Sequence, residues 1–296
     1  MKRFHRRFNR IWEVIVKLML LLLVSVAFAF ANNDGCTETG VLFTSPPPGE
    51  AVITATLIDS WSVTWAQQAL GLDCFEDGAT TYVLHSSNSD HYVQAFDPVS
   101  GTGMGTMNLD PANGSCFGVA FNNDPDSDSY LTDDWSDTVL YFTTNFGSSW
   151  STYPNPAGNA GRGMDFDGVD YWITNSSTGI YRFQPTVGQE AFTLGEVPSQ
   201  LSGLCVFPFM GDVGICVTTY NTHNLYFYQY DGSTMTYLGS VACPAACSSS
   251  YGLCYSDNRG TIFWSYNSGG YTIGEVEFDI DVALERSTWG EIKANF

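Results

Sequence analysis

Acidic side chains are the residues of this sequence best suited to catalysis. Asp73 and Asp165 occupy matching positions in two copies of an internal repeat, and glycoside hydrolysis requires two carboxyl groups at a defined separation. Outside the N-terminal segment the histidines are His85, His91 and His223, and none belongs to a Ser–His–Asp pattern for nucleophilic catalysis. An enzyme built on this chain would therefore use Asp73 and Asp165. The alternative is that both are small residues that fit a crowded inner strand.

The acidic run 122–128 indicates a second kind of site. Asp124, Asp126 and Asp128 place carboxylates at alternate positions of a turn, and clustered oxygen ligands at this spacing suit Ca²⁺. The run lacks the glycine and the glutamate of an EF-hand loop. The sequence predicts a calcium site at these three residues, with a solvated acidic turn as the alternative. A weaker acidic group surrounds Gly168.

Polar and aromatic residues recur in turns and links that should share one face of the fold. Such a ring suits a neutral polar ligand such as a glycan, because sugar faces stack on Trp and sugar hydroxyls pair with amides. Asn, Ser and Gly are also ordinary turn residues, so turn formation alone is the alternative. The candidate ligand-binding residues are His91, Trp135, Arg162, Asn175, Asn221 and His223.

An internal repeat positions all of these residues. Five segments begin with Gly and an apolar residue, roughly 40–50 residues apart, which is the spacing of β-propeller blades. After each come a turn, a second strand, a polar turn and a third strand, and in the first four repeats a fourth strand follows. In the third repeat Asp167-Gly168 predicts a two-residue hairpin. The repeated glycines are Gly71, Gly118, Gly163, Gly203 and Gly252.

The fifth repeat has only three strands before the chain changes character near residue 281. Residues 60–65 supply the missing strand, which would pair with the last blade and remove the open sheet edge. We predict an all-β fold, a β-propeller of five four-stranded blades closed by an N-terminal strand, with a short C-terminal helical tail. The predicted segments are a signal peptide (1–31), an N-terminal extension (32–58), the propeller (59–281) and the tail (282–296).

Charge and the N-terminus bound the partners and the compartment. The chain has 11 Lys and Arg against 31 Asp and Glu, a net charge of −20, which excludes electrostatic binding to nucleic acid or to an anionic membrane surface. More than half of its basic residues precede an apolar run at 18–31 that ends with Ala29 and Ala31. This pattern predicts a Sec-type signal peptide and secretion. The alternative, a membrane anchor, is disfavoured by the short apolar run.

The chain contains eight cysteines, and an even number in an exported protein favours disulfides. Cys205 and Cys216 flank a turn symmetrically, so the sequence predicts a bond between them. A second bond is predicted between Cys243 and Cys247 within one loop. Buried free thiols are the alternative for all four.

Residues 163–183 resemble the repeat of secreted bacterial YVTN/NHL-like propellers, and Trp172–Asn175 stands where that family has its tetrapeptide. Those propellers usually have six or seven blades, so a count of five departs from the family. The resemblance implies an extracytoplasmic, mostly non-catalytic ring and carries over no catalytic residue. We therefore expect a secreted, non-catalytic binding or surface-display module for a glycan or a protein partner. The alternative is a carbohydrate-active hydrolase that uses Asp73 and Asp165.

Overall fold

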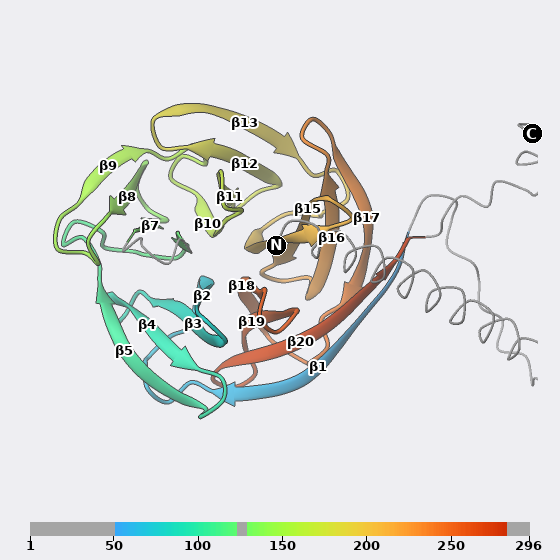
Figure 1. Cartoon of the computed structure of the whole chain (residues 1–296), viewed down its shortest axis with the longest axis horizontal. Coiled ribbons are helices and arrows are strands. Elements are labelled where there is room, and N and C mark those ends of the chain that lie inside the picture. Colours follow the sequence, from blue (N-terminus) through green and yellow to red (C-terminus); the bar gives the residue numbers. More distant parts are fainter. Residues whose placement is uncertain (1–50, 123–128, 283–296) are drawn as a thin grey trace, which may run out of the picture. The chain divides into compact units, whose positions relative to one another are not determined.

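The computed structural model describes residues 51–122 and 129–282. Twenty strands form five antiparallel sheets of four strands each, arranged as blades around a common axis (Figure 1). No helix occurs in these ranges, and hence none that could cross a membrane. The predicted five-bladed β-propeller is confirmed. The predicted helical tail and signal peptide lie outside the described residues.

Each of the first four blades consists of four strands that are consecutive in the chain, with the first strand innermost. Blade 1 contains β2 (Leu72–Asp77), β3 (Thr80–Ser87), β4 (Tyr92–Asp97) and β5 (Thr102–Asn108). Blade 2 contains β6 (Val119–Phe121), β7 (Tyr130–Asp133), β8 (Val139–Thr143) and β9 (Ser151–Pro154). Blade 3 contains β10 (Gly161–Phe166), β11 (Tyr171–Asn175), β12 (Gly179–Gln184) and β13 (Val187–Thr193). Blade 4 contains β14 (Leu201–Phe209), β15 (Asp212–Thr219), β16 (Asn224–Tyr230) and β17 (Met235–Ala242).

The fifth blade joins the two ends of the propeller. Its strands β18 (Ser249–Ser256), β19 (Thr261–Asn267) and β20 (Tyr271–Asp281) are completed by β1 (Val52–Ser62), which runs antiparallel to β20 (Figure 1). The predicted closure is confirmed, but the closing strand begins at Val52 rather than near residue 60. Its first half alternates between exposed and partly buried residues, the pattern of a strand with one buried face. That face packs on the core through Ile53, Ala55 and Leu57.

The repeated glycines explain how the blades fit together. A Cβ at Gly163 would lie 2.7 Å from the carbonyl oxygen of Ser202, and a Cβ at Gly203 would lie 2.5 Å from that of Tyr251. The other repeated glycines meet the next blade in the same way: Gly71 faces Phe117, Gly118 faces Arg162 and Gly252 faces Leu70. Only glycine allows two backbones to approach so closely. The five contacts run around the ring and close it between the last blade and the first.

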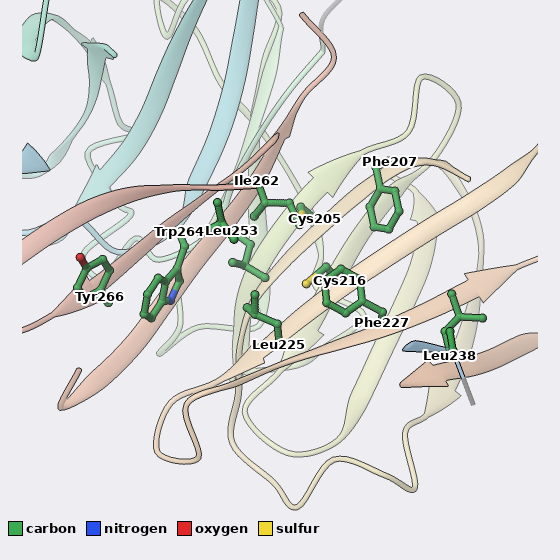
Figure 2. Close-up of a cluster of buried hydrophobic side chains, with 12 residues drawn as sticks. Cys205, Phe207, Cys216, Leu225, Phe227, Leu238, Leu253, Ile262, Trp264 and Tyr266 are labelled. Carbon is green, nitrogen blue, oxygen red and sulfur yellow. The ribbon is translucent and has the colours of Figure 1, made fainter. Parts of the chain in front are cut away.

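Apolar side chains fill the space between neighbouring blades. One large cluster, drawn in Figure 2, lies between blades 4 and 5 and includes Cys205, Phe207, Cys216, Leu225, Phe227, Leu238, Leu253, Ile262, Trp264 and Tyr266. Between blades 5 and 1, Trp65 stacks on Phe96 with ring centroids 4.8 Å apart, and Trp61 contacts both Phe96 and Phe263. Trp65 follows β1 rather than belonging to it. Burial of this apolar surface is the main force that holds the blades together.

Candidate functional site

A pocket of about 510 Å³ lies at one end of the propeller axis. The side chains that line it come from the links before the innermost strands, from the first residues of those strands, and from the turns between second and third strands together with Tyr271 at the start of β20. The sequence predicted the links and the turns. Because the first and second strands of a blade are antiparallel, these two kinds of segment meet at the same end. All five blades contribute to the pocket, which we call the axial pocket.

The floor of the axial pocket holds one residue from each blade, namely the residue immediately before the repeated glycine. These five are Leu70, Phe117, Arg162, Ser202 and Tyr251. Leu70, Phe117 and Tyr251 are buried and form a small apolar cluster. The close approach of the glycines draws the five positions together, so the repeat that builds the ring also builds the floor.

Aromatic rings and amides form the walls. Tyr251 contacts Tyr220 and Tyr271, with ring centroids 5.7 and 5.5 Å apart, and burial raises the pKa of Tyr251 to about 12. Trp135 stands on the other side and remains 42% exposed. Amide side chains complete the lining at Gln68, Asn88, Gln200 and Asn221. The site therefore offers flat apolar faces next to neutral donors and acceptors.

Arg162 is the one charged side chain among the residues that line the axial pocket. Its guanidinium carbon lies 4.8 Å from the Trp135 ring centroid and 5.7 Å from that of Phe117, and Nη1 donates to the Gly161 carbonyl at 2.7 Å. Burial lowers the pKa of Arg162, an effect that the nearby Asp133 opposes. No salt bridge to Arg162 forms within the described ranges.

Asp133 lies behind Arg162 at a position where the other blades have a hydroxyl. The equivalent residues are Ser86, Thr174, Thr218 and Ser265. Asp133 is fully buried, and its Oδ1 accepts hydrogen bonds from the backbone N–H groups of Phe117 at 3.0 Å and Gly118 at 2.6 Å. Its Oδ2 has no hydrogen-bond partner. Burial raises the pKa of Asp133 to about 7, against the lowering effect of the two N–H groups and Arg162.

The structure brings three of the six predicted ligand-binding residues, Trp135, Arg162 and Asn221, into the axial pocket. Asn175 instead caps its own turn, accepting from Ser177 N at 3.0 Å and Gly179 N at 2.9 Å. The residues that the sequence interpretation missed are mainly those before the repeated glycines, above all Ser202 and Tyr251. Their position beside the glycine was the signal that could have identified them.

The two predicted histidines lie at turns between second and third strands and do not line the axial pocket. His91 and His223 adopt left-handed backbone conformations, with φ of 58° and 56°. The Nδ1 atom of His223 lies 3.2 Å from the sulfur of Cys247.

A second pocket, of about 590 Å³, is lined mainly by the inner strands and the turns between first and second strands, at the opposite end of the axis. It is strongly acidic, with carboxyl groups from Asp73, Asp165, Asp167, Asp212 and Asp257. We call it the acidic pocket. Both carboxyls of the catalytic alternative therefore line the same pocket.

Asp73 and Asp165 also link neighbouring blades. Asp73 accepts from the backbone N–H of Phe121 in the next blade and from Cys74 N at 2.6 Å. Asp165 accepts from Val206 N in the next blade at 2.7 Å and from Phe166 N at 2.7 Å. Burial raises the pKa of both, that of Asp165 to about 7, and Asp165 raises the pKa of Asp73 further. Each carboxyl oxygen thus has a backbone donor.

The predicted calcium ligands Asp124, Asp126 and Asp128 lie outside the described residues. In the weaker group around Gly168, Asp167 accepts from Val169 N, Asp170 N and the Trp172 indole, so its oxygens serve the turn. Asp170 forms an ion pair with Arg182. Across the described part of the chain, no cluster of three or more His, Cys, Asp or Glu side chains is arranged to hold a metal ion.

The predicted disulfide partners Cys205 and Cys216 are directly opposite each other in the β14–β15 register. All seven cysteines in the described ranges, including Cys243 and Cys247, are free thiols in the structure. The two predicted disulfides therefore stay predictions. A sulfur contact that the sequence did not predict joins Cys74 to Cys254 at 3.0 Å.

Comparisons with known proteins identify the fold and no family. No protein-family model matches the sequence, and no curated protein matches it. Among solved structures, glutaminyl cyclase from Myxococcus xanthus aligns over 80% of this chain and 100% of its own, with a TM-score of 0.55 and 15% identity. A nidogen/laminin complex aligns over 68% of this chain and 73% of its own, with a TM-score of 0.50 and 13% identity. At such identities the likeness shows the fold alone. The chain is a five-bladed β-propeller.

Proposed function

We propose that this protein is an exported binding module whose axial pocket holds a glycan. The observation that carries the proposal is the convergence of all five blades on a pocket lined by aromatic rings and neutral amides. Trp135 and the Tyr220–Tyr251–Tyr271 cluster offer flat faces for sugar rings, and Gln68, Asn88, Gln200 and Asn221 offer partners for hydroxyls. Sites of this composition are typical of small polar ligands.

A glycan-array screen of the propeller beside its Trp135→Ala variant tests this proposal. We expect the wild type to bind a defined set of glycans and the variant to lose about tenfold or more in affinity, because the half-exposed indole is the largest stacking surface of the pocket. Val99→Ala, at an exposed position in the β4–β5 turn, is the matched control and should bind like the wild type. Glycan binding that survives Trp135→Ala unchanged would contradict the proposal, as would the absence of any bound glycan.

Export is the part of this proposal that rests on sequence. The basic residues before the apolar run at 18–31, the even number of cysteines and the resemblance of Trp172–Asn175 to the YVTN tetrapeptide support it. Expression of the full chain in a bacterial host should release a protein whose N-terminus follows Ala29 or Ala31. A product that keeps residues 1–31 would contradict this part of the proposal.

A second candidate function is hydrolysis of a carbohydrate in the acidic pocket. Asp73 and Asp165 line one pocket and both have raised pKa values, as a general acid requires. Their four backbone N–H partners favour instead a role in holding blades together. Turnover assays on oligosaccharides distinguish the catalytic role from the structural one, since Asp165→Asn should abolish hydrolysis if Asp165 is catalytic.

A further inference from the structure

We infer that the ligand of the axial pocket carries an anionic oxygen group, as an acidic sugar does, and that Arg162 and Ser202 bind it. This inference rests on the proposed glycan-binding function and names its ligand class. The lining of the axial pocket contains one positive side chain and no carboxylate, although acids outnumber bases almost three to one in the chain. A charge balance so different from that of the whole chain indicates selection for a negative group.

Arg162 is placed to receive such a group. Of its donors, Nη1 is used by the Gly161 carbonyl, and the guanidinium carbon lies over the rings of Trp135 and Phe117 at cation–π distances. A guanidinium carries its N–H donors in its own plane, in a fork that matches a carboxylate, so one carboxylate can accept from two of them. Burial makes the unpaired charge costly, as the lowered pKa of Arg162 reflects, and a bound anion would offset that cost.

Ser202 supplies the second, independent observation. It is 1% exposed, lines the axial pocket, and its hydroxyl has no hydrogen-bond partner. Arg162 and Ser202 lie on neighbouring inner strands at the same level, because Gly163 packs on the Ser202 carbonyl. A buried hydroxyl without a partner is unfavourable. An anion bound to Arg162 would accept its hydrogen and complete the site.

Asp133 sets the pH range of this site. The groups around its carboxyl are Arg162 from blade 3, Asp134 from its own turn, Cys116 from the link and the backbone N–H groups of Phe117 and Gly118. With a pKa of about 7, Asp133 is largely neutral at pH 6 and leaves the Arg162 charge available. Ionisation above pH 7 places a negative charge behind Arg162, so anion binding should weaken there.

The decisive probes are a galacturonic acid trimer, its methyl ester and a sulfated trisaccharide, with binding measured by calorimetry at pH 6. We expect the free acid to bind about 10- to 100-fold more tightly than the ester, the range for a charge-assisted hydrogen-bonded pair. Arg162→Gln should remove that preference and leave binding of the ester within about twofold, while Arg162→Lys keeps only part of it. Ser202→Ala should weaken acid binding by about two- to tenfold.

The outcomes separate this inference from the proposed function. Equal binding of acid and ester, or an acid preference that survives Arg162→Gln, overturns the anion site while glycan binding stands. If neither trimer binds, a glycan array that contains acidic glycans beside their neutral counterparts tests the anion site. Binding of neutral glycans alone also overturns the anion site. Tighter binding of the sulfated probe would identify sulfate rather than carboxylate as the group. A protein that binds no glycan at all fails the proposed function and this inference with it.

A different observation carries a second inference: we propose that Cys74 and Cys254 form a disulfide that locks blade 1 to blade 5. Both are fully buried on innermost strands of these adjacent blades, and their sulfurs lie 3.0 Å apart. Unbonded sulfurs do not pack so closely, whereas a bond of about 2.05 Å needs a movement of about 1 Å. Cys254 occupies the position that Asp73 and Asp165 occupy in blades 1 and 3, and like them it reaches into the next blade.

The bond forms by exchange with a disulfide oxidant of the exporting compartment. One cysteine thiolate attacks the oxidant, the oxidant's S–S bond breaks, and a mixed disulfide and one small thiol result. The second cysteine then displaces the other small thiol, so the protein loses two electrons and two protons to the oxidant. Burial raises the pKa of Cys74 to about 11, so this reaction belongs to folding, before the two blades enclose the sulfurs.

Peptide mapping without reduction, after oxidative refolding and alkylation, tests the bond. We expect a peptide that links Cys74 to Cys254, and a melting temperature about 5–15 °C lower for the Cys74→Ser/Cys254→Ser variant, since the bond closes a loop of 180 residues. The Cys205→Ser/Cys216→Ser variant should retain the linked peptide. Recovery of Cys74 and Cys254 as alkylated thiols, or linked to other cysteines, would overturn the proposal. The same map tests the two predicted disulfides.

Discussion

At the scale of single residues, the hydrogen bonds that a side chain makes within the protein decide whether it remains available to a ligand. Trp135 and Arg162 were predicted as ligand-binding residues and line the axial pocket. Asn175 has an equally suitable amide, but its oxygen is used by the turn that follows. The sequence could not show whether the Asn175 amide is free to bind a ligand or is used by its turn, because Asn does both.

Asp133 gives a residue-scale prediction. We expect Asp133→Asn to reduce the change in stability between pH 5 and pH 8, because the amide keeps one acceptor for the Phe117 and Gly118 N–H groups but cannot ionise. Urea unfolding at both pH values measures the difference, which should shrink by about 2–4 kcal/mol. Asp279→Asn, at an exposed position on β20, should leave the difference unchanged. An undiminished pH dependence in Asp133→Asn would show that the carboxyl is ionised throughout.

At the scale of strands and turns, the repeat predicted all five blades because each contains the same succession of apolar strands and polar turns. Its predicted third strand in blade 2, residues 139–143, matches β8 (Val139–Thr143). The two-residue hairpin turn predicted at Asp167-Gly168 is displaced by one residue: Phe166 pairs with Tyr171, and Asp167 N donates to the Asp170 carbonyl at 3.1 Å, so Gly168 and Val169 are its central residues. The Asp167 carboxylate accepts from Val169 N and Asp170 N, and this capping fixes the position of the turn.

The repeated glycines give a prediction at this scale. Gly163→Ala should destabilise the propeller by about 3 kcal/mol or more, because its Cβ would lie 2.7 Å from backbone atoms of Gly203 and Ser202 that cannot move independently. Gly105→Ala in β5 is the matched control, since nothing lies within 4 Å of its Cβ. That control should change stability by less than about 0.5 kcal/mol. Denaturant unfolding of both variants provides the comparison, and equal stabilities would refute the close-approach explanation of the repeat.

The carboxylates that link neighbouring blades give a second prediction at the scale of strands and turns. Asp165→Ala should cost about 1–3 kcal/mol of stability, since it leaves the buried N–H groups of Val206 and Phe166 without an acceptor. Asp165→Asn keeps an acceptor and should cost less. Thermal unfolding at pH 6 measures the stability that each variant loses. The ratio of the Asp165→Asn loss to the Asp165→Ala loss separates the contribution of hydrogen bonding from that of side-chain packing. A larger loss for Asn than for Ala would contradict this role.

At the scale of the whole molecule, the sequence predicted the closed ring because the last repeat lacked a strand that the N-terminal segment could supply. The start of that strand was missed, although Pro46–Gly49 mark a break just before it and its early half alternates between exposed and partly buried residues. The convergence of five residues on one floor was not predicted, because the position before each repeated glycine becomes informative only once the glycines are known to bring the blades into contact.

Stability of the whole propeller should be greater at pH 5 than at pH 8. Asp73, Asp133 and Asp165 have raised pKa values in the folded state, so the folded chain holds protons that the unfolded chain has released. The contributions of Asp133 and Asp165 are lost as pH rises from about 4 through their folded pKa values of about 7, and that of Asp73 changes in the same direction. His85 acts in the opposite direction, because burial lowers its pKa to about 4 and its contribution is lost as pH falls below about 6.5. The three acids together should change the free energy of unfolding between pH 5 and pH 8 more than the one histidine does. Melting temperatures that rise steadily from pH 5 to pH 8 would contradict this balance.

The central claim, that a ligand enters the axial pocket, is tested most directly by hydrogen exchange of the propeller with and without its best array glycan. We predict that the glycan slows hydrogen exchange in the segments that line this pocket, residues 116–118, 160–163 and 200–203, and leaves exchange in the turn at 167–170 unchanged. Protection of the turn at 167–170 instead would place the ligand in the acidic pocket and contradict the account.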